Sequence, residues 1–360
     1  MLVTLSKLSL LVLATVQLAR SLATSRRSTC TEPSIRVEWN TLTEDQKAAY
    51  FAAELCLFAA PAKTGIPGVV SRYDDFVGTH AQQADLPDGN DHWHVTGQSV
   101  LLQCSSYTTL TQRLYFTDSY MSIATTSMLT KQSFVPSADI LVLYVQLVFT
   151  LFVKRITTLQ LPYWNELADA GKFAASPVLL DFGGNGREED DWAVIDGPFA
   201  NLTRYLGYGP TNTKHLLTRK VNETESLEAG QTYVDALFAQ DTFSGFKNAM
   251  GILTTQSGVH IAGHLGIGGD MGDYVTSPND PTFWMHHGYI DYLWWKWQGD
   301  NKTRINDLNN MGYETQKEPA TGYVETSGDT VIYLFDILPD VTVADVLDTQ
   351  NGLLCYIFAT

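Results

Sequence analysis

The chain is short of basic residues. It has 23 Lys and Arg against 39 Asp and Glu among 360 residues, which gives a net charge of -16 and a pI of about 4.8. A surface of this sign repels nucleic acid and anionic membranes, and it suits a small neutral or cationic substrate better than a polyanion. Charged residues make up only 17% and hydrophobic residues 44%, so the composition is not that of a disordered chain and supplies a sizeable core.

The sequence also lacks an internal repeat and an interdomain linker, so we expect one domain of the mainly α class. Helical spacing of apolar residues predicts helices at 43–58, 232–250, 258–265 and 281–298, the first of them capped by Thr43. Residues 266–280 are rich in Gly, Asp and Pro and predict a loop. After Glu318 the pattern changes to short strands, for example at 330–335.

No apolar run reaches the roughly 20 residues that a membrane span needs. The run from Leu8 to Leu18 follows Lys7 and precedes a small-residue cleavage pattern at Ser21 and Ala23. This arrangement indicates a signal peptide over residues 1–23, with an N-terminal anchor as the alternative. We therefore predict a secreted protein whose single domain spans residues 24–360.

Cysteine is scarce, and the four present allow three pairings in an oxidising compartment. Glycosylation sequons begin at Asn201, Asn222 and Asn301. Each is a short pattern that arises by chance, but together with the signal peptide they favour a secreted glycoprotein with disulfides.

Histidine is absent between His94 and His215, and seven of the eight histidines fall in two clusters. In the second cluster, His260 and His264 stand four residues apart, which places both imidazoles on one face of a helix. Two such histidines are often solvated or core residues. A zinc protease needs Glu directly after the first histidine, and Ile261 stands there instead.

A third imidazole from His286 or His287, on the helix at 281–298, would complete a three-nitrogen metal site. Imidazole suits Cu, Zn, Fe and Ni. Three neutral nitrogens without a carboxylate or thiolate leave the charge of the ion uncompensated, and they leave coordination positions open to an exogenous ligand.

The residues around these histidines resemble the second copper signature of the tyrosinase and catechol oxidase family, in its short secreted fungal form. The resemblance covers most of the chain from about residue 30. It is carried by Asp280-Pro281, Phe283-Trp284, His287 and Asp291, by Gly268-Gly269, Ser277-Pro278-Asn279 and Leu293-Trp294-Trp295, and by Val37-Glu38-Trp39, Tyr73-Asp74-Asp75-Phe76, Leu161-Pro162-Tyr163-Trp164-Asn165, Phe182-Gly183-Gly184-Asn185-Gly186 and Leu354-Cys355-Tyr356.

The resemblance implies a four-helix-bundle core that holds two copper ions, with short peripheral strands and long loops. The second copper would be bound by His260, His264 and His287, while His286 would pack or hydrogen-bond beside them. The first copper would take His80 and His94, with His92 as the substitute for His94. Such a protein oxidises o-diphenols, and in some members monophenols, to o-quinones with dioxygen.

The sequence departs from the family where the third ligand of the first copper is expected. Residues 99–158 are Ser/Thr-rich and then β-branched, and they contain no histidine. Three explanations stand: an insert or mis-translated segment, a degenerate copy that binds copper at the second site alone, or a substitute ligand. His215 is the remote candidate for that substitute, and it otherwise reads as a surface residue beside Lys214.

The resemblance bears on three further points. It implies a disulfide between Cys30 and Cys355, which leaves Cys104 as a candidate partner for Cys56. Many hydroxylating members carry Asn after the first ligand of the second site, so Ile261 favours oxidation of o-diphenols. A dioxygen carrier is the non-enzymatic alternative, against which the short secreted chain argues. Neither the natural substrate nor the oligomeric state follows from the sequence.

Overall fold

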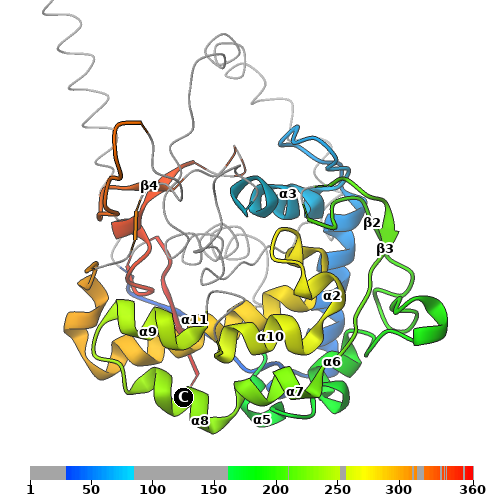
Figure 1. Ribbon diagram of the computed structural model, residues 1–360, viewed down its shortest axis with the longest axis horizontal. Helices are drawn as coiled ribbons and strands as arrows, with labels where there is room; N and C mark the ends of the chain where they lie inside the picture. Colours follow the sequence, from blue (N-terminus) through cyan, green and yellow to red (C-terminus); the bar gives the residue numbers. More distant parts are fainter. Residues whose placement is uncertain are drawn as a thin grey trace, which may run out of the picture.

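The chain folds around a helical core, as the sequence predicts (Figure 1). The computed structural model describes residues 30–84, 161–209, 211–251, 257–309, 312–313, 320–332, 335, 337, 339–351 and 353–359. Within these residues the strands are short and pair only in twos. Four tryptophans are among the largest fully buried side chains of the core, namely Trp39, Trp164, Trp284 and Trp297.

The α-helices are α2 (Glu44–Ala59), α3 (Arg72–Ala84), α5 (Glu166–Asp169), α6 (Pro177–Asp181), α7 (Glu223–Ser226), α8 (Gln231–Phe238), α9 (Phe243–Met250), α10 (Val259–Ile267) and α11 (Thr282–Asp300). The strands are β1 (Ser34–Arg36), β2 (Thr203–Arg204), β3 (His215–Leu216), β4 (Val331–Ile332), β5 (Val341–Thr342) and β6 (Tyr356–Phe358). Two single-turn 3-10 helices, η7 (Gly269–Gly272) and η8 (Ser277–Asn279), lie within the loop predicted at 266–280.

Helix α2 begins where its sequence says it should. The Thr43 side chain accepts a hydrogen bond from the Gln46 backbone N–H, and the Gln46 side chain accepts one from the Thr43 N–H. This capping box satisfies two backbone donors that the first turn leaves free. The helix ends at Ala59, just before Pro61.

The helix predicted at 232–250 is in fact two helices, α8 and α9. Helix α8 ends at Phe238, and the Thr242 side chain caps α9 by accepting from the Gly245 N–H. The apolar spacing continues through the break, so periodicity alone did not reveal it. A Thr that can satisfy a free backbone donor favours a new helix start over continuation.

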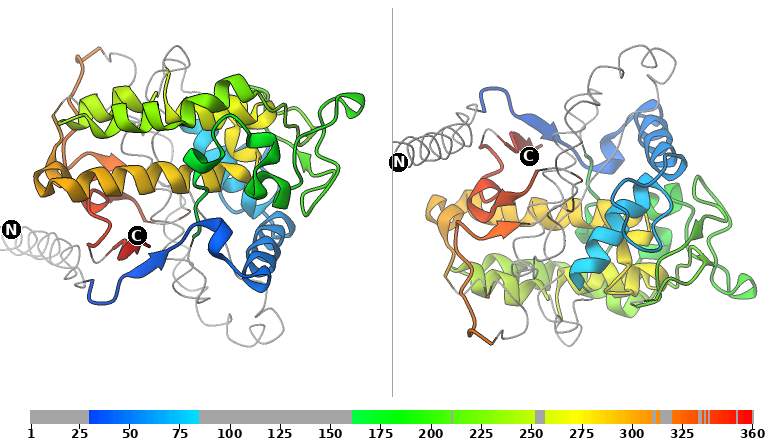
Figure 2. Two further views of the ribbon diagram at one scale, coloured as in Figure 1. Left: turned by 90° about the horizontal axis from the view of Figure 1, so that it is seen from below. Right: turned by 90° about the horizontal axis from the view of Figure 1, so that it is seen from above.

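Helices α10 and α11 lie against each other, and α10 also contacts α7 (Figures 1 and 2). The loop that joins them is fixed at its end by a fully buried ion pair. Arg219 donates from Nε and Nη2 to the two carboxylate oxygens of Asp280, at 2.7 and 2.8 Å, and from Nη1 to the carbonyls of Phe182 and Gly184. Two parallel charge-assisted hydrogen bonds define the geometry tightly. The entry into α11 is therefore held in place.

The two ends of the described chain are tied together (Figure 2). Strands β1 and β6 pair in parallel, and the implied disulfide between Cys30 and Cys355 is confirmed. Buried Arg36 donates to Asp291 of α11 at 2.9 Å and lies over the Tyr356 ring. Tyr356 also donates to Asp291, at 2.9 Å. Asp291 is thus a structural ion-pair residue that links α11 to both termini.

Cys56 is also disulfide-bonded, to a partner outside the described residues. The signal peptide at 1–23 and the atypical segment at 99–158 lie outside them too, and so does the region where the fourth bundle helix is expected. No helix within the described ranges could cross a membrane. The three sequon asparagines are exposed, and their glycosylation stays a prediction.

We expect Arg36→Met to lower the free energy of unfolding by about 3–5 kcal/mol, because it leaves the buried Asp291 carboxylate without its cation. The control is Arg187→Met, whose ion pair with Asp196 has side chains 50% and 66% exposed, and which should change stability by less than about 1 kcal/mol. Urea unfolding measures both. Equal effects of the two variants would contradict a structural role for the Arg36 pair.

Candidate metal centre

Two imidazoles project from one face of α10. His260 and His264 are four residues apart, and both are buried. Their Nε2 atoms are 3.1 Å apart. The i, i+4 spacing therefore brings the two nitrogens together, as the sequence predicted.

His287 approaches the pair from α11. Its Nε2 atom lies 3.3 Å from Nε2 of His264, and its side chain is buried. Tetrahedral coordination with metal–nitrogen distances of about 2.0 Å separates neighbouring nitrogens by about 3.3 Å. The two measured separations are close to that spacing.

Backbone carbonyls orient the two rings on α10. Nδ1 of His260 lies 3.1 Å from the Gly251 carbonyl, and Nδ1 of His264 lies 2.8 Å from the Met271 carbonyl. A carbonyl oxygen only accepts, so each Nδ1 carries the proton and each Nε2 carries a lone pair. Two lone pairs 3.1 Å apart repel each other unless a cation lies between them. This donor set fits a bound metal ion.

Two histidines of the cluster, His264 and His287, are neutral. Burial lowers the pKa of each well below the ordinary value, and the neighbouring imidazoles lower both further. A metal ligand must be deprotonated at the coordinating nitrogen. These two side chains thus supply that form throughout the neutral range.

His80, predicted as a ligand of the first copper, lies near the same cluster. It stands on α3, and its Nδ1 lies 2.8 Å from the Val275 carbonyl in the loop between α10 and α11. Burial lowers its pKa to about 4. The Phe283 ring lies 5.6 Å from the His80 ring and 4.1 Å from the His287 ring, centroid to centroid.

His94 and its substitute His92 fall outside the described residues. Of the five predicted ligands, the structure therefore places four in one region and does not address the fifth. His80, His260, His264 and His287 come from three helices, and their assignment to copper ions stays a prediction.

His286 hydrogen-bonds, as the sequence suggested. Its Nδ1 lies 2.7 Å from Oε1 of Glu166, and both side chains are fully buried. Burial raises the pKa of Glu166 well above its usual value and lowers that of His286 to about 3. A hydrogen bond between Oε1 and Nδ1 thus joins the two buried side chains. Sequence reasoning missed Glu166, whose only signal is its place directly after the family-like segment ending at Asn165.

His215 is not the surface residue that the sequence suggested. Its Nε2 lies 2.6 Å from Asp270 in η7, and its side chain is 11% exposed. Burial lowers the pKa of His215, but the hydrogen bond and charge of Asp270 outweigh burial and raise it overall. Asp270 also accepts from the Thr218 backbone N–H and hydroxyl. His215 and Thr218 together therefore fix η7 in the loop between α10 and α11.

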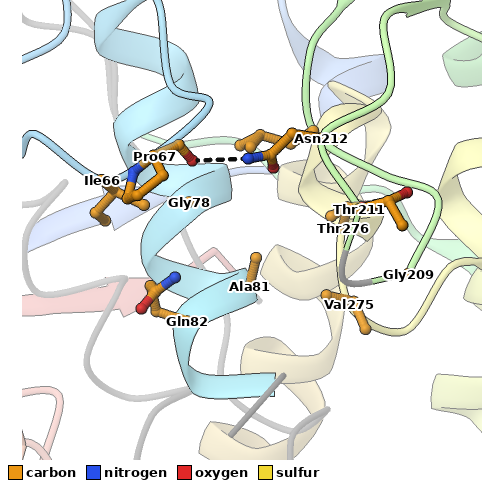
Figure 3. Close-up of a pocket in the computed structure, with 11 residues that line it drawn as sticks. Ile66, Pro67, Gly78, Ala81, Gln82, Gly209, Thr211, Asn212, Val275 and Thr276 are labelled. Atoms are coloured by element: carbon orange, nitrogen blue, oxygen red, sulfur yellow. Dashed lines mark hydrogen bonds between the residues drawn. The ribbon is translucent and has the colours of Figure 1, made fainter.

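A small pocket lies on the flank of α3 (Figure 3). Its walls are α3 on one side and segments around 209–212 and 275–276 on the other. Asn212 closes one end by donating to the Pro67 carbonyl at 3.3 Å. No described histidine lines this pocket, although Val275, whose carbonyl orients His80, is among its lining residues.

The part of the chain around this centre is similar to known proteins. A family model described as the common central domain of tyrosinase matches residues 143–300. The match takes in the second cluster of histidines. It leaves out His80 and His94, and it begins inside the atypical segment 99–158.

Two curated fungal relatives match over most of this chain, and a bacterial one matches over about half of it. The tyrosinase-like protein phomQ2 of Diaporthe leptostromiformis is 26% identical over 92% of this chain and 74% of its own length. The N-acetyl-6-hydroxytryptophan oxidase ivoB of Emericella nidulans is 26% identical over 90% of this chain and 91% of its own. The tyrosinase of Streptomyces glaucescens is 33% identical over 52% of this chain and 66% of its own.

Among solved structures, a polyphenol oxidase variant from Thermothelomyces thermophila shares the fold. The alignment covers 96% of this chain and 93% of that one, with a TM-score of 0.65 and 24% identity. The mainly helical architecture is thus shared with that protein.

Acid should destabilise the metal-free chain through His80. Above pH 6.5 this histidine is neutral whether the chain is folded or unfolded. Between pH 6.5 and about 4 only the unfolded chain binds the proton, so stability falls as the pH falls. From pH 7 to pH 5 we expect wild type to lose about 2 kcal/mol more than His80→Gln. Urea unfolding in a chelator at both pH values measures this, and parallel losses would refute it.

Proposed function

Because this chain is a member of the tyrosinase family, we propose that it is a copper-dependent oxidase that converts o-diphenols to o-quinones with dioxygen. The observation that carries the proposal is the set of buried, neutral imidazoles whose Nε2 atoms converge at 3.1 and 3.3 Å. Two o-diphenols give two o-quinones while one dioxygen is reduced to two waters. The oxidase name of the Emericella relative supports an oxidised aromatic substrate.

Copper bound to imidazoles supplies the electron transfer that couples the oxidation of a phenol to the reduction of dioxygen. His260, His264 and His287 would hold the second ion. His80 and His94 would hold the first. The protein contributes nitrogen donors in fixed orientations and a buried surrounding, with the Phe283 ring packed against His80 and His287.

A second candidate function follows from the missing histidine. No histidine occurs between His94 and His215, so the first copper has two predicted ligands instead of three. A degenerate family member would bind copper at the second site alone and would not oxidise phenols. The orientation of His260 and His264 by Gly251 and Met271 is equally consistent with this function.

The natural compartment is extracellular in our proposal. The disulfide between Cys30 and Cys355 supports it, since such bonds persist in oxidising compartments. The predicted signal peptide and the exposed sequons fit the same compartment.

Copper content and quinone formation test the function together. A working oxidase of this family binds two copper ions per chain and oxidises catechol, and its His264→Ala variant should lose one ion and all oxidation, because it removes a nitrogen of the second site. A chain whose first copper keeps only its two predicted ligands should form little or no quinone. Metal analysis and the absorbance of the quinone measure the two outcomes. One copper per chain with no quinone would overturn the oxidase in favour of the degenerate member.

The side chain after His260 should set the preference among phenols. Ile261 is only 4% exposed and offers no polar group to assist deprotonation of a monophenol. We expect Ile261→Asn to raise the ratio of monophenol hydroxylation to catechol oxidation several-fold. The initial rates on a monophenol and on its o-diphenol measure this ratio, with Ile261→Leu as the apolar control. An unchanged ratio would count against this role of residue 261.

A further inference from the structure

The fully buried pair of Glu166 and His286 has no part in the proposed chemistry. Residue 286 stands beside a predicted ligand, yet its Nδ1 is bound to Glu166 at 2.7 Å. Burying two polar groups is unfavourable unless they satisfy each other. The pair therefore calls for a role that an apolar pair would not fill.

The His286 ring fits a slot that the sequence of α10 leaves open. Residue 263 lies between the two α10 histidines and is glycine. A Cβ at this position would overlap Nδ1 and Cε1 of His286. The ring thus packs directly against the backbone of the helix that carries His260 and His264.

From this slot His286 touches each of the other imidazoles of the cluster. Its ring centroid lies 5.4 Å from that of His260, 4.9 Å from that of His264 and 4.8 Å from that of His287. One ring nitrogen from each of the four histidines lies within 4.8 Å of the others. The position of the His286 ring therefore limits where the three predicted ligands can stand.

We propose that Glu166 and His286 are positioning residues of the second metal site, with Glu166 fixing the His286 ring in the Gly263 slot so that His260, His264 and His287 keep their spacing. His286 itself gives no nitrogen to the ion. This inference rests on copper binding at that site. It extends the proposed function by assigning a task to two residues outside the ligand set. Partners that orient metal ligands typically change metal affinity 10–100-fold when removed.

The test compares two replacements of Glu166. Glu166→Gln keeps an oxygen and an amide opposite Nδ1 of His286, whereas Glu166→Leu keeps the volume and removes the hydrogen bond. Copper(II) is added alone, below one equivalent. Its dissociation constant is measured by competition with a chelator, and its parallel hyperfine splitting by electron paramagnetic resonance. We expect Glu166→Leu to weaken copper binding about tenfold and to change the splitting, and Glu166→Gln to resemble wild type.

A matched control separates positioning from general destabilisation. Glu54 on α2 is as buried as Glu166, its pKa is also raised well above the usual value by burial, and its partner is the Tyr50 hydroxyl at 2.9 Å. Glu54→Leu should lower the stability of the metal-free chain while leaving the affinity for copper and the splitting at their wild-type values.

Gly263→Ala gives a second route if Glu166→Leu does not fold. Its methyl group displaces the His286 ring without removing any ligand, so it should reproduce the weaker binding and the altered splitting. His286→Asn keeps a donor opposite Glu166 and removes Nε2. X-ray absorption spectroscopy gives the number of nitrogen atoms bound to copper, and this number should be the same for His286→Asn as for wild type.

Three outcomes would overturn the proposal. Wild-type copper binding by both Glu166→Leu and Gly263→Ala would show that the pair does not position the site. Loss of one copper-bound nitrogen in His286→Asn would make His286 a ligand. Failure of the wild-type chain to bind copper would remove the proposed function and this inference together, whereas the first two outcomes leave the proposed function intact.

Discussion

The structure depends on one unfavourable contact. Nε2 of His264 lies 3.1 Å from Nε2 of His260 and 3.3 Å from Nε2 of His287, inside a buried region. The two α10 rings are held with their lone pairs inward because their Nδ1 atoms face the carbonyls of Gly251 and Met271. Such an arrangement raises the free energy of the folded chain without a cation and lowers it with one. Metal binding therefore removes a repulsion that the fold itself creates.

The loop between α10 and α11 keeps that contact in place, and three of its carboxyl groups anchor it. Asp270 binds His215 and Thr218, Asp273 accepts from the Gly209 N–H, and Asp280 pairs with Arg219. The buried carboxylates of Asp270 and Asp280 and the half-buried one of Asp273 thus fix the loop through hydrogen bonds.

The sequence predicted what local pattern specifies and missed what only tertiary contact creates. Helix α2 was predictable because Thr43 can cap it and apolar residues follow at helical spacing, and the structure adds Gln46 as the second member of the capping box. The predicted ligands rest on spacing and family resemblance. The break before α9 was missed, because a single capping hydrogen bond decided it. Glu166 could not have been found either, since its partner His286 is 120 residues away and nothing local requires a buried carboxyl group.

The loop between α10 and α11 also contacts predicted ligands of both copper ions. The Met271 carbonyl orients His264, and four residues later the Val275 carbonyl orients His80 on α3. A displacement of this loop would therefore move a predicted ligand of each copper at once. Within the described residues, the carbonyls of Val275, Gly251 and Met271 orient His80, His260 and His264. In the proposed function, oxidation of phenols therefore depends on the first copper, for which the sequence offers two predicted ligands, His80 and His94, where the family uses three.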